Sequence, residues 1–104
     1  MRRGDVWWAQ LPAPIGARPV VLLSRDEAYH VRNLVTIAPI TTTVRHLPVE
    51  VPLGPSEGLS KPCVANLDTI MTIRKAQLTR SLSSLPADKM HEINQALKFA
   101  LAIP

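Results

Sequence analysis

The sequence contains a single cysteine, Cys63, and this excludes an internal disulfide. The cysteine lies in the segment KPCVANL, where no neighbouring histidine or pair of cations would activate a thiolate. We therefore expect it to be a small residue of a core strand. No spacing of histidine, cysteine and aspartate suggests a metal site, so we expect neither a metal nor another cofactor.

Long apolar runs are also missing. No stretch approaches the roughly 20 consecutive apolar residues that a membrane-spanning helix requires. The opening segment MRRGDVWWAQL contains the charged Asp5 and has a strand-like pattern, unlike the long apolar segment of a signal peptide. These features predict a cytoplasmic protein without a membrane partner.

Linkers, internal repeats and low-complexity segments are absent too, so residues 1–104 are expected to form one domain. Twelve Lys and Arg against eight Asp and Glu give a formal net charge of +4, and arginine outnumbers lysine. The planar guanidinium of arginine suits bidentate contacts with phosphate. Charge alone leaves open whether the partner is a nucleic acid.

Glycine is scarce and proline is frequent, with four and ten residues respectively, which argues against a helical bundle. Short apolar runs alternate with turn residues at the spacing of a small sheet or barrel. The runs are VWWAQL, PVVLLS, LVTIAPI, VEVPL, CVANL, IMTI and QLTRSL. In VEVPL the alternation predicts that Val49 and Val51 face one way and Glu50 the other.

The last segment, SSLPADKMHEINQALKFALAIP, has the period of an amphipathic helix instead. Its apolar stripe consists of Met90, Ile93, Leu97, Ala100 and Leu101. Pro86 suits the start of a helix, and Asp88 suits the first turn. A second, short helical turn is expected at Asp26 to Tyr29. The predicted fold is mainly β (α+β), a small, strongly bent antiparallel sheet with a C-terminal helix packed on it.

A polar cluster follows the predicted strand LVTIAPI. Thr41, Thr42 and Thr43 precede Arg45 and His46, which brings together three hydroxyls and two potential phosphate ligands. Threonine also suits an edge strand because it is β-branched, and the segment RHLP suits a solvated turn. The pattern alone leaves a structural and a functional role open.

Five segments, in the same order, resemble the MazF/PemK family of toxin endoribonucleases from toxin–antitoxin pairs. The segments RGDVWWAQL and GARPVVLLS resemble the family's first two strands, and APITTTVRHLPVEVPL resembles its API-T-S/T-T segment and the strand after it. The segment GLSKPCVANLDTIMTI resembles GL-x-x-x-S-V-x-x-x-DQIRTI, and LTRSLSSLPADKMHEINQALKFALAI resembles the terminal strand and helix. The resemblance covers nearly the whole chain and implies a homodimeric SH3-like or CcdB-like barrel with a cognate MazE-like antitoxin.

The resemblance also implies a toxin that inhibits translation and growth by cutting single-stranded RNA at short sequences, without a metal ion. The RNA 2′-hydroxyl attacks the adjacent phosphorus, leaving a 2′,3′-cyclic phosphate and a 5′-hydroxyl. Arg18 matches the family's catalytic arginine, and Thr41 its catalytic serine or threonine. Both would donate to the charge that develops on the phosphate oxygens. The alternatives are a surface ion pair for Arg18 and a hydrogen bond within the strand region for Thr41.

Six further residues are expected to contact RNA: Gly16, Thr42, Thr43, Arg45, His46 and Asp68. His46 is also a candidate acid or base, with a solvated turn as the alternative for this residue and Arg45. Asp68 matches the aspartate of the family's DQ pair, with a structural turn as its alternative. Trp8 is expected in the core, and Trp7 at a dimer or antitoxin surface or stacked on a base.

Three departures from the family pattern concern RNA recognition. The loop PAPIGA is shorter than usual, Ala17 replaces a histidine of some members, and Met71 replaces a frequent arginine. A short loop should leave the groove more open, or leave proton transfer to His46 or water. Two alternatives to the endoribonuclease remain: a CcdB-like toxin that poisons DNA gyrase without nuclease activity, and a nucleic-acid-binding module that has lost catalysis.

Overall fold

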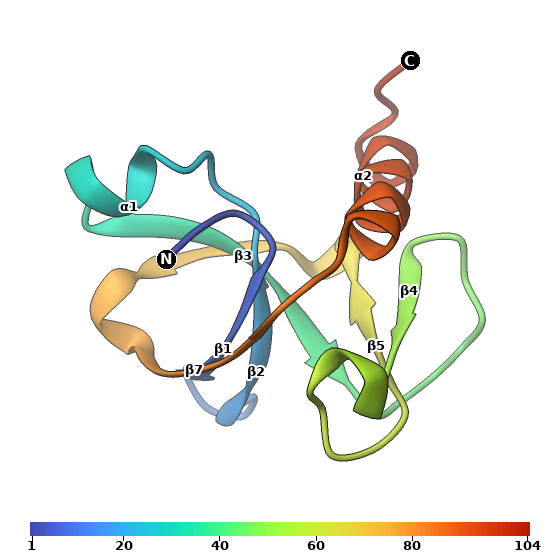
Figure 1. Ribbon diagram of the computed structural model, residues 1–104, viewed down its shortest axis with the longest axis horizontal. Helices are drawn as coiled ribbons and strands as arrows, with labels where there is room; N and C mark the ends of the chain where they lie inside the picture. Colours follow the sequence, from blue (N-terminus) through green and yellow to red (C-terminus); the bar gives the residue numbers. More distant parts are fainter.

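Seven strands and a C-terminal helix form the computed structural model, which describes all residues 1–104 (Figure 1). The strands are β1 (Asp5–Gln10), β2 (Ala17–Leu22), β3 (Leu34–Thr41), β4 (Glu50–Leu53), β5 (Cys63–Asn66), β6 (Met71–Arg74) and β7 (Leu78–Ser84). The helices are α1 (Ala28–Val31) and α2 (Ala87–Leu101). Each of the seven apolar runs forms a strand, and the expected helical turn lies at α1, so the predicted order of elements is confirmed.

All the strand pairs are antiparallel, and the order across the sheet is β4-β5-β3-β2-β1-β7, with β6 also paired to β3. The first half of β3 pairs with β6, from Leu34 to Ile37, and its last two residues pair with β5. The mainly β fold is confirmed, but the sheet is not a closed barrel. Strands β4 and β7 do not pair with each other, and they remain at the two ends of the strand order.

The sheet has an apolar cluster on each face. Along β2, Val21 belongs to one cluster and Val20 and Leu22 to the other, because successive residues of a strand point to opposite faces. Both faces are therefore covered, which explains why the run PVVLLS is continuously apolar rather than alternating. Helix α2 covers the first cluster through Ile93 and Ala96.

Helix α2 stands beside β4, and the C-terminus projects away from the sheet (Figure 1). Pro86 precedes its first turn, and Asp88 lies within that turn, as predicted. Its buried or packed residues are Met90, Ile93, Ala96, Leu97 and Ala100. Leu101 differs from the prediction, because 52% of its surface is exposed. No helix is long and apolar enough to cross a membrane.

The two adjacent tryptophans of β1 face opposite sides, as the alternation predicts, but the assignment of their surroundings was wrong. Trp7 packs against the second apolar cluster, and its Nε1 atom is buried without a hydrogen-bond partner. Trp8 instead lines an open cavity on the other face. Because both faces of the sheet are covered, the alternation alone could not identify the core side.

The packing of α2 on the sheet predicts a large stability difference between two apolar truncations. Ile93 is 0% exposed, so Ile93→Ala should lower the free energy of unfolding by about 2–5 kcal/mol through lost burial and a residual cavity. Leu101→Ala, in the same helix, should change it by only about 0.5 kcal/mol. Urea unfolding followed by circular dichroism measures both values. Equal losses would contradict the packing described.

Candidate active site

The strand register brings Arg18 and Thr41 together. Strands β2 and β3 pair Val20 with Pro39, and the same antiparallel register continued by two residues places Arg18 opposite Thr41. At this point β3 pairs with β5 and no longer with β2. A cavity of about 270 Å³ lies here, and both side chains line it. The complete lining is Ile15, Arg18, Pro39, Thr41, Thr43, Arg45, Asn66, Thr69 and Met71.

The guanidinium of Arg18 has no carboxylate partner. The structure contains one ion pair, Lys89–Glu92 at 3.3 Å, and it lies on α2. The Nη2 atom of Arg18 donates a long hydrogen bond of 3.4 Å to the Ile15 carbonyl, while its buried Nε atom has no partner. A buried donor left unpaired costs about 1–3 kcal/mol, so this group is suited to an incoming acceptor. The structure contradicts the alternative of a surface ion pair for Arg18.

The hydroxyl of Thr41 is oriented by the backbone next to it. Its Oγ1 atom accepts a hydrogen bond of 3.1 Å from the N–H of Thr43. Accepting this bond uses a lone pair and leaves the hydroxyl proton available as a donor. The local hydrogen bond expected as an alternative is thus present, and it is compatible with a donor role in the cavity.

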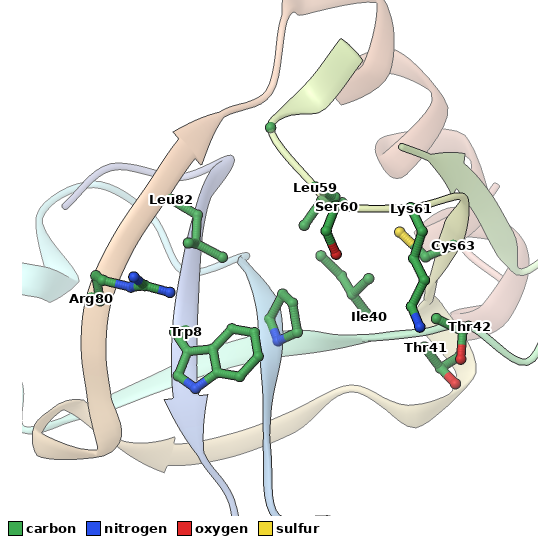
Figure 2. A pocket seen from close by; sticks show the side chains of 12 residues that line it. Trp8, Ile40, Thr41, Thr42, Leu59, Ser60, Lys61, Cys63, Arg80 and Leu82 are labelled. Atoms are coloured by element: carbon green, nitrogen blue, oxygen red, sulfur yellow. The ribbon is translucent and has the colours of Figure 1, made fainter. Parts of the chain in front are cut away.

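A second cavity, of about 300 Å³, shares Thr41 with the first. Figure 2 shows Trp8 and Arg80 on one side of it, and Lys61, Thr41 and Thr42 on the other. Cations can contact phosphates, and an indole ring can stack on a base. Chemically different surfaces therefore meet at Thr41.

The predicted RNA contacts divide into two groups. Those that line a cavity are Thr42, Thr43 and Arg45. Those that line neither cavity are Gly16, His46 and Asp68. Each residue of the second group adjoins one that does line the first cavity. RNA contact by the six residues stays a prediction.

The turn after β5 shows why Asp68 is not in the cavity. The Oδ1 atom of Asn66 accepts the N–H of Asp68 at 2.9 Å and caps a short 3-10 turn, Leu67–Thr69, which leaves Asp68 exposed. Asn66 and Thr69 line the cavity instead. Neither Asn66 nor Thr69 was named as a candidate from the sequence. Asparagine often accepts a hydrogen bond from the backbone N–H two residues later and so marks a turn, and this signal could have drawn attention to Asn66.

The short loop between β1 and β2 folds into a tight turn. The N–H of Leu11 donates to the Gly16 carbonyl at 3.1 Å, and that of Ile15 donates to the Pro12 carbonyl at 3.0 Å. Gly16 has a φ of 71°, which only glycine adopts without strain, so its conformation serves this turn. The loop contributes Ile15 to the cavity wall.

The loop between β3 and β4 is fastened by Glu50. Its carboxylate accepts the N–H of Arg45 at 3.0 Å and that of Leu47 at 3.1 Å. The hydrogen bond from Leu47 is the main cause that lowers the pKa of the Glu50 carboxyl. Val49 and Val51 are buried on the opposite side, as the alternation predicted.

Cys63 is a buried residue of β5, which confirms the prediction. Its Sγ atom donates to the Leu53 carbonyl at 3.6 Å, and burial raises the pKa of the thiol. The other chemistry-bearing side chains are dispersed: no three of the His, Cys, Asp and Glu residues are gathered where a metal ion would be held.

The family of the protein follows from a match over almost its whole length. Residues 2–101 match the model of the PemK-like, MazF-like toxins of type II toxin–antitoxin systems. The chain therefore belongs to this family of toxins.

Two relatives from Mycobacterium tuberculosis extend the match. The probable endoribonuclease MazF5 is 41% identical over 100 residues, which cover 95% of this chain and 91% of the relative. The endoribonuclease MazF3 is 42% identical over 82 residues, covering 78% of this chain and 79% of the relative.

Solved structures agree with the sequence comparison. The Mycobacterium tuberculosis toxin MazF-mt6 superposes with a TM-score of 0.90 at 36% identity, covering 96% of this chain and 98% of that one. An endoribonuclease from a mycobacterial species, solved in complex with its cognate antitoxin, superposes with a TM-score of 0.87 at 32% identity. That match covers 100% of this chain and 97% of the other.

The burial of Cys63 predicts low thiol reactivity in the folded protein. We expect the native protein to react with Ellman's reagent on the order of a hundredfold more slowly than the same protein in guanidinium chloride, because the thiol must be exposed and ionised to react. Absorbance of the released thiolate measures both rates. Cys63 lines the second cavity, so a rapid reaction of the native protein would show that this cavity opens more widely than described.

Proposed function

We propose that this protein is the toxin of a type II toxin–antitoxin system and cuts single-stranded RNA at the cavity between Arg18 and Thr41 without a metal ion. The observation that carries the proposal is the Arg18 guanidinium, which has no carboxylate partner and a free buried Nε donor, and which shares a cavity with the Thr41 hydroxyl. The endoribonuclease names of MazF5 and MazF3 support the assignment of substrate and reaction. Cutting cellular RNA would inhibit translation and growth.

The proposed reaction exchanges one phosphorus–oxygen bond for another. The 2′-oxygen of the RNA forms a bond to phosphorus while the bond to the 5′-oxygen breaks, which gives a 2′,3′-cyclic phosphate and a 5′-hydroxyl. Negative charge increases on the non-bridging oxygens in the transition state, and Arg18 and Thr41 supply preorganised donors for it. A guanidinium keeps its proton near neutral pH, so Arg18 acts as an electrostatic clamp and not as a base.

Proton transfer in this scheme passes through water. The 2′-hydroxyl loses its proton, and the 5′-oxygen gains one when it leaves. No histidine, aspartate or glutamate lines the cavity, and His46 stands in the neighbouring loop. Water is therefore preferred to a side chain as proton acceptor and donor, and His46 is left without a catalytic role.

RNA would cross both cavities, with the reacting phosphate at Thr41. Arg45 and Thr43 would contact the strand in the first cavity, and Trp8, Lys61 and Arg80 in the second. Phosphate contacts by these cations would supply affinity, and stacking on the indole ring tolerates any base. The net charge of +4 also favours binding of the negatively charged RNA.

A MazE-like antitoxin is the proposed protein partner, and the toxin is proposed to be a homodimer. The related mycobacterial endoribonuclease was solved with its cognate antitoxin. An acidic antitoxin segment with apolar anchors would suit cavities that combine Lys61, Arg80 and Trp8, and it would fold as it binds. The gyrase-poisoning alternative is not favoured, because that activity has no need of Arg18 beside Thr41.

Substitution of Arg18 or Thr41 should abolish most of the RNA cleavage. We expect Arg18→Ala and Thr41→Ala to lower kcat/KM by roughly a hundred- to a thousandfold, the usual effect of removing one transition-state donor. Thr41→Ser keeps the hydroxyl and should retain most of the activity. A long unstructured RNA, incubated with each protein in EDTA and mapped for 5′-hydroxyl ends, gives the measurement and the cleaved sequence.

Two exposed residues outside both cavities provide matched controls. Arg32→Ala and Thr72→Ala remove the same chemical groups and should leave cleavage unchanged. Intact RNA after incubation with folded wild-type protein, including total cellular RNA, would refute the nuclease and make gyrase inhibition the next assay. Cleavage that persists in both Arg18→Ala and Thr41→Ala would refute the proposed site.

A further inference from the structure

One carboxylate holds the exposed loop that links the proposed reaction site to β4. Residues 42–48 are all exposed, so the loop has no apolar core of its own. Apart from the contact of Thr43 with Thr41, its backbone is held by the Glu50 side chain and by a hydrogen bond of 3.0 Å from the Glu50 N–H to the Leu47 carbonyl. Ordering several exposed residues costs conformational entropy, which these few bonds must offset.

The geometry around the carboxylate is that of a backbone anion site. Arg45 donates to both oxygens of Glu50, at 3.0 Å and 3.3 Å, and Leu47 donates to one of them at 3.1 Å. Between the two donors, His46 has a φ of 56°, a left-handed conformation that is uncommon outside glycine. Such a change of backbone hand lets neighbouring N–H groups converge on one anion, which here is a side chain of the protein itself.

Glu50 joins this loop to the rigid part of the site. It begins β4 and pairs with Asn66 of β5, and Asn66 lines the first cavity. On the loop side it holds the backbone of Arg45, whose side chain lines the same cavity. The carboxylate points away from the core because its neighbours Val49 and Val51 are buried.

We propose that Glu50 is a positioning residue for RNA binding, which holds the loop so that Arg45 stays in the cavity with Arg18 and Thr41. This inference rests on the proposed function and adds a requirement to it. Arg18 and Thr41 belong to strands, so loss of the Glu50 carboxylate leaves them in place. The loss therefore weakens substrate binding and spares the chemical step.

Removal of the Glu50 carboxylate changes KM in opposite directions, depending on whether Glu50 acts by positioning the loop or only through its negative charge. Taking a negative charge away from the RNA path would by itself tighten RNA binding and lower KM. A mobile loop has the opposite effect, because affinity falls in proportion to the fraction of molecules with the loop in place. We expect Glu50→Ala to raise KM on the order of tenfold with kcat little changed. Glu50→Gln, which keeps one carbonyl acceptor, should lie between the wild type and Glu50→Ala.

Glu57 provides a matched control. Its Oε1 atom accepts the N–H of Gly54 at 2.7 Å in a different loop, so Glu57→Ala removes an equal charge and a similar hydrogen bond. It should lower KM or leave it unchanged. Thermal unfolding of all variants establishes that they fold, and the rate of tryptic cleavage after Arg45 reports how firmly the loop is held. We expect this cleavage to be fastest in Glu50→Ala.

The outcomes distinguish this proposal from the proposed function. If KM is unchanged or lowered in Glu50→Ala, or if kcat alone falls, the positioning role of Glu50 is overturned. Cleavage by the wild type would still uphold the nuclease in that case. A wild type that cleaves no RNA would refute the nuclease. In that case fluorescence anisotropy with a labelled single-stranded RNA replaces KM. Weaker binding by Glu50→Ala than by Glu57→Ala then supports the role of Glu50, and equal binding overturns it.

Discussion

The pairing of β2 with β3 ends before β3 does, and the arrangement of the site depends on this. From Val20–Pro39 to Leu22–Ile37, β3 is bonded to β2, and at Ile40 and Thr41 it is bonded to β5, which follows β6 along its other edge. A strand that stayed in register with β2 to its end would bury the backbone that now borders the first cavity. The early end of this pairing instead leaves a hollow, with a β2 side chain on one side and the end of β3 on the other. The two proposed catalytic side chains thus belong to strands that main-chain hydrogen bonds hold in place.

The order of elements was predictable because it depends on local patterns. The apolar runs and their turn residues predicted seven strands, and the three- and four-residue spacing near Ile93 predicted α2. The opposite faces of Val49 and Glu50 followed from alternation alone. Arg18 and Thr41, singled out through the family resemblance, do line one cavity. Their catalytic roles stay predictions.

Most of what escaped prediction depends on contacts between distant segments. Trp7 and Trp8 were assigned to the wrong surroundings because apolar residues pack on both faces of the sheet. Alternation shows that the two side chains face opposite ways, but it does not show which of them packs in a core and which lines a cavity. Asp68 is an exception: it was named for its match to the family's DQ aspartate, and the local cap by Asn66, which leaves Asp68 exposed, was overlooked. The barrel did not close because closure requires β4 and β7 to meet, and nothing in either strand's own sequence specifies that pairing.

The sharing of Thr41 between two cavities has a consequence for how such a toxin could diversify. Both cavities are lined by residues of β2, β3 and β5, and β1, β7 and the segment before β5 contribute to the second alone, but Thr41 is the one residue that lines both. If a phosphate reacts at their junction, the nucleotides before and after it meet different side chains. Preference for a base on one side of the cut can then change by substitution without disturbing the other side. Under the proposed function, a change of target sequence would then leave Arg18 and Thr41, and with them the reaction, as they are.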